Sequence, residues 1–342
     1  FQKQVLNFIR PKLENTNKVL QGIGIPHSAL LSVIFGMMFL AFPLGAYVMF
    51  NSDLGGDINF QFPLNQMDIF LAGIGINVPI NVEVGDAFIV LWIFYIIFFT
   101  VAMMGPKDGF LKTMSSLLSH GKLKTKSNYM VAVTKWFSIL ILTSAIINFS
   151  QELFGVSTIP PIIENDLTQF FYVSLAPLTE EIGFRVILIG IPLFAFYSQK
   201  TSIKHFFKSL WSPSDNLHIV NSRRAILLIV IVAAFFGISH IISGESWSNG
   251  KFAQATASGI ILGWLYFRFG LVAAILVHWA TNYFVFSYVN FVSQISFISV
   301  EEAFSHSLIS TMEIIFLISG VLSVSILVIN YFYSKREPAL EI

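Results

Sequence analysis

The sequence predicts an all-α polytopic membrane protein with about eight transmembrane helices and a small extracytoplasmic β-hairpin. Three observations support this fold class. The 342 residues are 55% hydrophobic and only 11% charged, whereas soluble proteins carry about 25% charged residues. Long apolar segments recur along the chain, and the mean hydropathy is +0.74. The Lys and Arg residues gather in every second connection between these segments, which is typical of membrane proteins.

The composition also excludes several classes of protein. The chain has no cysteine, which rules out disulfides, thiolate zinc sites, iron–sulfur clusters and a cysteine nucleophile. A net charge of +1, without basic clusters that alternate with aromatic residues, argues against a nucleic-acid partner. The chain begins at Phe1 rather than at a methionine, so we expect its start to be processed or incomplete.

Eight segments are apolar enough, and long enough at about 20 residues, to cross a hydrocarbon core of about 30 Å. The sixth and seventh of them are the least distinct, because only the stretch FRFG separates them. The expected spans are 28–50, 87–105, 129–150, 170–197, 225–243, 252–268, 270–292 and 308–333.

The charges in the connections predict how the protein is oriented. The N-terminal segment, the connections after the second and fourth spans, and the C-terminal end are rich in Lys and Arg. The alternate connections, near 51–86, 151–168 and 293–307, contain neither residue, and 244–251 contains only Lys251. Because basic connections stay in the cytoplasm, we expect a multi-pass protein of the cell membrane with both termini cytoplasmic.

Two further segments are not expected to span the membrane. In 51–86, the stretches INFQF and INVPINVEV alternate apolar with polar residues on either side of Gly73-Ile-Gly75, which predicts the external hairpin. Residues 201–211 mix aromatic and aliphatic residues with two lysines, a pattern typical of an amphipathic helix at the membrane surface. We expect another amphipathic segment at the N-terminus, in residues 1–27.

Ionisable residues are rare within the expected spans, and the deepest of them lie on three helices. Span four carries Glu180, Glu181 and Arg185, span five carries His240, and span seven carries His278. A charge in mid-helix costs roughly 2.5–3.5 kcal/mol on insertion scales, so such residues are typical of functional sites. The other histidines are expected at the solvated surface: His27, His120, His205, His218 and His306.

The spacing of these residues predicts which of them meet. Glu181 and Arg185 are four residues apart and share a helix face, so the arginine can neutralise the carboxylate. Glu180 lies about 100° around the helix, where it can face other partners. His278 and Asn282 are also four residues apart, which places an imidazole and a carboxamide one above the other.

Two kinds of hydrolytic site fit this set of residues. In the first, Glu180 takes a proton from a water that His240 positions, and His278 and Asn282 stabilise the oxyanion of the attacked amide. In the second, Glu180, His240 and His278 are ligands of a catalytic Zn²⁺ that holds a water in its fourth position. The residues alone do not choose between a metal-free site and a zinc site.

Three motifs in this order resemble a known family, the CAAX prenyl protease type II and bacteriocin-processing family of intramembrane proteases, also called CPBP or Abi. The family pattern is EExxxR, then FxxxH, then HxxxN. Here the motifs read Glu180-Glu181-Ile-Gly-Phe-Arg185, Phe236-Gly-Ile-Ser-His240 and His278-Trp-Ala-Thr-Asn282. The resemblance covers about residues 168–290 and leaves out the first three spans, the hairpin and the last helix.

The resemblance implies an endopeptidase that cleaves membrane-associated proteins or peptides, which are prenylated in the eukaryotic branch. Members are commonly called metalloproteases, and a metal-free glutamate mechanism has also been argued for the family. The roles that the resemblance implies are water activation for Glu180 and His240, oxyanion binding for His278 and Asn282, and support of these groups by Glu181 and Arg185.

These interpretations divide the chain into four parts and leave two alternatives open. The parts are the segment 1–27, three spans with the hairpin in 28–150, a catalytic core in 168–292, and a last span with a cytoplasmic tail in 308–342. One alternative is a non-catalytic scaffold, or an accessory subunit of a larger membrane complex, that binds partner subunits through the hairpin. The other is a transporter or proton relay, which predicts a continuous polar path rather than one polar cluster.

Overall fold

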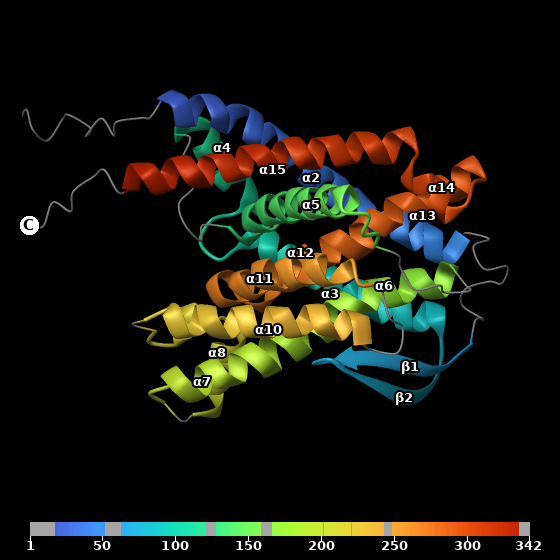
Figure 1. Cartoon of the computed structure of the whole chain (residues 1–342), viewed down its shortest axis with the longest axis horizontal. Helices are drawn as coiled ribbons and strands as arrows, with labels where there is room; N and C mark the ends of the chain where they lie inside the picture. Colours follow the sequence, from blue (N-terminus) through green and yellow to red (C-terminus); the bar gives the residue numbers. More distant parts are fainter. Residues whose placement is uncertain are drawn as a thin grey trace, which may run out of the picture.

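The computed structural model describes residues 18–51, 63–120, 128–158, 166–200, 202–219, 221–242 and 248–334. In this part of the chain the protein is mostly helical, and its long helices lie roughly along one axis (Figure 1). The β-hairpin lies at one end of this bundle, and helices α7 (Ile191–Tyr197) and α8 (Ile203–Trp211) lie at the other.

Six helices among the described residues are long and apolar enough to cross a membrane. They correspond to the first, second, third, fifth, seventh and eighth expected spans. Their bounds are α2 (Lys18–Asn51), α3 (Val84–Met104), α5 (Tyr129–Leu153), α10 (Arg223–Ile242), the continuous segment Leu271–Ser296 and α15 (Ser307–Ser334).

The fourth and sixth expected spans are helical as well, but neither is a plain apolar helix. The sixth is α11 (Lys251–Phe269), whose first half carries polar residues such as Gln254 and Ser258. The count of eight membrane passes therefore stays a prediction. The fourth expected span is divided into α6 (Asp166–Glu180), the π-helix η1 (Glu181–Gly190) and α7 (Ile191–Tyr197), and the seventh into α12 (Leu271–Trp279), the π-helix η2 (Ala280–Phe284) and α13 (Val285–Ser296).

Four short helices complete the part of the fold that the structure describes. The amphipathic helix expected in 201–211 is confirmed as α8, with Ile203 and Phe207 exposed and Leu210 buried. An amphipathic segment was expected in 1–27; residues 1–17 lie outside the described residues, and 18–27 form the first turns of α2. The short helices are α4 (Phe110–His120), α8 (Ile203–Trp211), α9 (Pro213–Asn216) and α14 (Val300–Phe304).

The expected hairpin is confirmed as a two-stranded antiparallel sheet of β1 (Pro63–Leu71) and β2 (Ile74–Glu83). Its turn differs from the expectation, because Gly75 lies within β2, opposite Phe70. The two turn residues are Ala72 and Gly73, with φ values of 52° and 86°. Positive φ at both positions is typical of a tight two-residue hairpin turn. The stretch INFQF, which was expected to form the first strand, lies outside the described residues, and β1 consists of residues that the sequence analysis did not assign to a strand.

The core is centred on α12, in which all nine residues from Leu271 to Trp279 are buried. Aromatic rings connect it to the neighbouring helices. Trp279 stacks on Tyr283 with ring centroids 5.3 Å apart and on Phe42 of α2 with centroids 5.2 Å apart. This dense packing fixes the helix that carries His278.

The first and last long helices meet through a polar contact that the sequence did not predict. His27 was expected at the solvated surface, and this expectation was wrong: its side chain is fully buried, and Nε2 lies 2.9 Å from Ser323 Oγ on α15. The physical reason is that α2 begins at Lys18, well before the apolar segment that hydropathy marks, so His27 lies inside the bundle.

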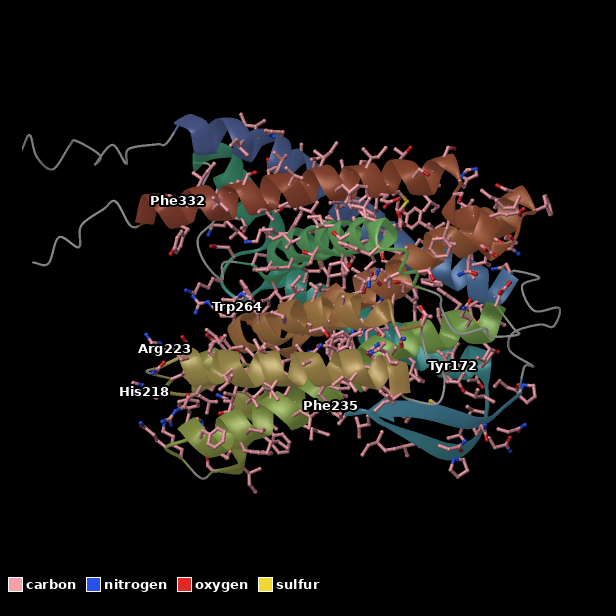
Figure 2. The ribbon with its side chains drawn as sticks, viewed as in Figure 1. Tyr172, His218, Arg223, Phe235, Trp264 and Phe332 are labelled. Carbon is pink, nitrogen blue, oxygen red and sulfur yellow. The ribbon has the colours of Figure 1, made fainter. Side chains whose placement is uncertain are left out.

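The two ends of the bundle differ in the sign of the charged residues that they carry. The basic end carries α8 and the beginning of α10, and Figure 2 shows His218 and Arg223 there, away from the hairpin. The hairpin end carries acidic side chains in its connections and helix ends. Among them are Asp86, Glu152, Asp166, Glu301 and Glu302.

Candidate active site

The residues of the three sequence motifs come from separate helices and meet at one place. Four of them are buried, and His240 and Asn282 are half-buried. The set consists of Glu180, Glu181 and Arg185 at the junction of α6 with η1, His240 in the last described turn of α10, and His278 and Asn282 at the junction of α12 with η2.

Both junctions begin π-helices. In a π-helix the hydrogen bonds join residues five apart, and such wide turns occur frequently at functional sites. Glu181 and Arg185 lie in η1, and Asn282 lies in η2. The sequence analysis assumed ordinary α-helical geometry at these positions. The apolar pattern of the two spans gives no signal of the wider turns.

The predicted Glu181–Arg185 pair is confirmed. Arg185 Nε donates to Glu181 Oε2 at 2.9 Å, and both side chains are fully buried. The guanidinium carbon also lies 4.9 Å from the centroid of the Phe236 ring, a distance at which a cation is attracted to an aromatic face. These contacts offset part of the cost of burying the pair, while Nη1 and Nη2 of Arg185 have no hydrogen-bond partner among the described residues.

Glu181 has a second partner that the sequence spacing did not predict. Its Oε1 atom lies 3.0 Å from His278 Nδ1. A carboxylate only accepts hydrogen bonds, so Nδ1 of the imidazole is the donor. The contact fixes the orientation of the His278 ring and directs its Nε2 atom toward Glu180.

Glu180 lies between the two histidines. Its Oε2 atom is 3.9 Å from His278 Nε2 and 4.0 Å from His240 Nε2. These distances are too long for direct hydrogen bonds, but a single water can bridge groups at this separation. Within the described part of the chain, this buried oxygen has no hydrogen-bond partner.

The tautomer of His240 follows from its own hydrogen bond. Its Nδ1 atom lies 2.8 Å from the carbonyl oxygen of Phe236, so Nδ1 carries the hydrogen and Nε2 is free of it in the neutral ring. The Phe236 ring also packs edge-on against the imidazole, with centroids 4.5 Å apart. His240 therefore presents an acceptor nitrogen toward Glu180.

Asn282 is held by its neighbours at the edge of the same site. Its Nδ2 atom donates to the carbonyl oxygen of Val173 at 3.2 Å, and its Oδ1 atom accepts from Thr281 Oγ1 at 3.3 Å. The amide group has two hydrogens, and the contact with Val173 uses one of them. The second can serve a ligand in the site.

A cavity of about 390 Å³ connects these groups. Glu180, His240, His278 and Asn282 all line it. Polar residues that the sequence analysis did not assign to the site line it too, at the first turns of α6 and α11. Of these residues, the sequence analysis noted only Lys251, as the single basic residue of the connection 244–251. These additional polar residues are Gln169, Lys251 and Gln254.

Residues 165–284 match a family model described as Type II CAAX prenyl endopeptidase Rce1-like. The matched segment contains every residue of the three motifs and ends with η2. Residues 165–284 form a domain of this CAAX endopeptidase family. The chain matches no curated protein and no solved structure.

The Rce1-like domain excludes the hairpin, and yet the hairpin contacts the candidate active site. A side chain at Gly183 of η1 would overlap the backbone of Ala72 in the hairpin turn. Phe70 of β1 packs near Phe184 and His240, with ring centroids 6.0 and 6.3 Å away. The sequence analysis treated the hairpin as a separate external element and missed this contact.

The family resemblance raised the question of a zinc ion, which the distances between the candidate donor atoms address. The ligand set would be Glu180, His240 and His278. Zinc holds nitrogen and oxygen ligands at about 2.0–2.2 Å in a tetrahedron, so neighbouring donor atoms would lie roughly 3.4 Å apart. The carboxylate oxygen is 3.9 and 4.0 Å from the two nitrogens. Among the described residues, no three metal-binding side chains are grouped closely enough for a metal ion. As they lie, these residues do not fit a zinc ion.

Proposed function

We propose that this protein is an intramembrane endopeptidase that hydrolyses a peptide bond in a membrane-associated protein or peptide. Water activated by Glu180 and the histidines is the nucleophile. The observation that carries the proposal is the position of Glu180 Oε2, 3.9 and 4.0 Å from two histidine nitrogens, in a cavity of an Rce1-like domain.

The first chemical step is the attack of water on the carbonyl carbon of the scissile bond. Glu180 accepts one proton from the water, and His240 Nε2 orients the water by accepting a second hydrogen bond. The carbonyl oxygen becomes an oxyanion. It is stabilised by hydrogen bonds from Asn282 Nδ2 and from Nε2 of His278 in its protonated form.

The second step is the breakdown of the tetrahedral intermediate. The proton held by Glu180 passes to the leaving nitrogen, the carbon–nitrogen bond breaks, and the products are an amine and a carboxylic acid. Glu180 returns to its ionised form. The same carboxylate thus acts first as the general base and then as the general acid.

Glu181 and Arg185 act through His278 rather than on the substrate, so they are positioning residues. The carboxylate of Glu181 accepts from His278 Nδ1 and stabilises the positive charge of the protonated ring. Arg185 holds that carboxylate in place. A buried carboxylate that orients a histidine is a recurring arrangement in hydrolytic enzymes.

The membrane arrangement that supports this function has eight passes, with α6–η1–α7 and α11 as the two beyond the six apolar helices. The basic end of the bundle lies in the cytoplasm, together with both termini. The division into the N-terminal segment, three spans with the hairpin, the catalytic core 168–292 and the last span follows this arrangement.

The substrate is a protein or peptide held at the membrane by a lipid chain or by an apolar segment. The apolar residues of the cavity wall suit either anchor. They come from α5, α6, α11 and α13, and include Leu140, Ile141, Tyr172, Val173, Leu262 and Phe286.

The test is membrane proteomics of cells that carry the wild type, Glu180→Ala or His278→Ala at equal protein levels, with N-terminal peptides mapped. We expect the same precursor to accumulate uncut in both variants. If both match the wild type while deletion of the gene destabilises a membrane complex, the endopeptidase is refuted and a scaffold takes its place.

A further inference from the structure

The cavity extends from the catalytic residues toward only one end of the bundle. Along α6 its lining runs from Glu180 back to Gln169, which is about 16 Å at about 1.5 Å per residue. Along α11 its lining runs from Lys251 to Leu262. Gln169 and Lys251 lie in the first turns of their helices, so the cavity reaches the end of the bundle where α6 and α11 begin, and we refer to this end as its mouth.

Other contacts place this mouth at the hairpin end of the bundle. Gln151, near the end of α5, donates to the carbonyl oxygen of Gly250 at 2.7 Å, directly before α11. Ser248 donates to the carbonyl oxygen of Ser157 at 2.9 Å. Figure 2 shows Tyr172, which also lines the cavity, on the side of the hairpin.

Toward the basic end the molecule is closed by packed side chains. On α10 the lining includes Phe236 and His240, and from Phe236 back to Arg223 the helix continues for about 20 Å. The side chains that face the interior of the bundle along that stretch have little or no exposure. Among them are Ile189, Ile229, Leu265 and Tyr266, none more than 3% exposed.

The two ends lie on opposite sides of the membrane. From Lys251 to Phe269, α11 rises about 27 Å, close to the thickness of a hydrocarbon core of about 30 Å. Tyr266, near the far end of α11, donates to the carbonyl oxygen of Leu210 in α8 at 2.8 Å. The exposed lysines of α8, Lys204 and Lys208, lie at that end.

We propose that the substrate enters this site from the non-cytoplasmic side, as an extended segment of an exported or membrane-anchored protein. The proposal rests on the proposed function, because it takes the cavity as the catalytic site. It follows from the position of the mouth, opposite the basic end that the positive-inside rule assigns to the cytoplasm. A prenylated C-terminus presented from the cytoplasm would meet the closed end.

The chemistry of the mouth suits a polypeptide backbone. The amide of Gln169 can donate to carbonyl oxygens and accept from amide hydrogens. The Gln254 amide nitrogen donates one hydrogen to Asn148 Oδ1 and carries a second, and Lys251 adds a cation at the same end. The length of the cavity along α6, about 16 Å, equals about five residues of extended chain at roughly 3.3 Å each. A short extended segment therefore reaches from the membrane surface to Glu180.

The absence of cysteine from the sequence allows a direct test. Gln254→Cys places one thiol at the mouth, and His218→Cys places one at the exposed basic end as the matched control. Each variant is treated with a membrane-impermeant maleimide in right-side-out vesicles and in inverted vesicles. We expect Gln254→Cys to be labelled in right-side-out vesicles only, and His218→Cys in inverted vesicles only.

The opposite labelling pattern would overturn the proposal, and so would labelling of Gln254→Cys in inverted vesicles. This labelling result does not depend on proteolysis.

Mapping the cleavage sites that Glu180→Ala abolishes tests the substrate itself. We expect them in non-cytoplasmic segments. A Glu180-dependent cut in a cytoplasmic tail would refute entry from outside and keep the endopeptidase. Identical cuts in wild type and variant would refute the endopeptidase function, while the labelling result would still decide the side on which the cavity opens.

Discussion

His278 Nδ1 lies 3.0 Å from Glu181 Oε1, and this contact joins two helices whose motifs are 97 residues apart in the sequence. It extends the buried Arg185–Glu181 pair into a chain of three groups that ends at the cavity. The second nitrogen of the ring then faces Glu180. Glu181 and Glu180 are adjacent in the sequence, yet one holds a histidine in place and the other presents an oxygen to the cavity.

Replacement of Glu180 by the isosteric Gln should abolish the general base and keep the shape of the site. We expect Glu180→Gln to lower the cleavage rate by about 10²–10⁴-fold, the usual contribution of a positioned acid or base. The measurement is the rate of precursor processing at equal protein levels. Glu313→Gln on the exposed face of α15 is the matched control and should cleave like the wild type. A Glu180→Gln variant at more than a tenth of the wild-type rate would contradict the assignment.

Removal of Arg185 should destabilise the protein, because it leaves the carboxylate of Glu181 buried without its cation. We expect Arg185→Met to lower the free energy of unfolding by about 3–5 kcal/mol. The double variant Glu181→Gln/Arg185→Met should recover part of this loss, since no charge is then left unpaired. Unfolding in detergent measures both effects. A double variant less stable than Arg185→Met would show that the pair does not work in this way.

The Asn282 side chain should stabilise the transition state more than it stabilises the bound substrate. Asn282→Ala removes a donor to the oxyanion, so we expect kcat to fall about 10²–10³-fold with little change in KM. Asn216→Ala in α9, whose amide donates only to backbone carbonyls at the basic end, should leave kcat unchanged. A raised KM with an unchanged kcat would instead assign Asn282 to ground-state binding.

Phe70 should matter although it lies outside the Rce1-like domain. Its ring packs edge-on against His240, and such aromatic pairs contribute about 0.5–1.5 kcal/mol, so we expect Phe70→Ala to lower kcat by about two- to tenfold. Phe70→Tyr should restore the rate, and the pH profile of kcat should shift in Phe70→Ala because the environment of His240 changes. Ile76→Ala, at an exposed position of β2, is the control. An unchanged pH profile would mean that Phe70 only stabilises the hairpin.

The separation of the three candidate metal ligands leads to a prediction about chelators. Because Glu180 Oε2 is 3.9 and 4.0 Å from the two imidazole nitrogens, we expect cleavage by the purified protein to stay within about twofold of its rate after treatment with 1,10-phenanthroline, since zinc would draw these donors closer together. Metal analysis of the same sample completes the measurement. Loss of activity that Zn²⁺ restores would refute the metal-free mechanism.

Much of the fold and most of the site follow from local patterns in the sequence. Apolar length located the six long apolar helices of the described residues, and the four-residue spacing predicted the Glu181–Arg185 contact. The order of the three motifs indicated the family of the domain. These properties are encoded by residues close together in the chain, which is why a single sequence reveals them.

The remaining features depend on contacts between distant segments. The turn at Ala72 packs on Gly183, and Glu181 binds His278, but neither pairing leaves a periodic signal in the sequence. The π-helices were missed because a wider turn needs no special composition. Hydropathy placed His27 outside the first span, since polar residues before it hide the continuation of the helix. The roles of the site residues stay predictions until variants are measured.

The bond between His27 and Ser323 has a consequence for how the protein is made. The two residues are separated by 296 positions, so α2 enters the membrane long before α15 has been synthesised. Tyr288 of α13, whose hydroxyl donates to the carbonyl oxygen of Met37 at 3.1 Å, also arrives late. During translation, His27 and the carbonyl of Met37 on α2 therefore lack their partners at first. The bundle is complete only when the last helix has inserted. Early helices held by the insertion machinery until that moment would be protected from wrong partners.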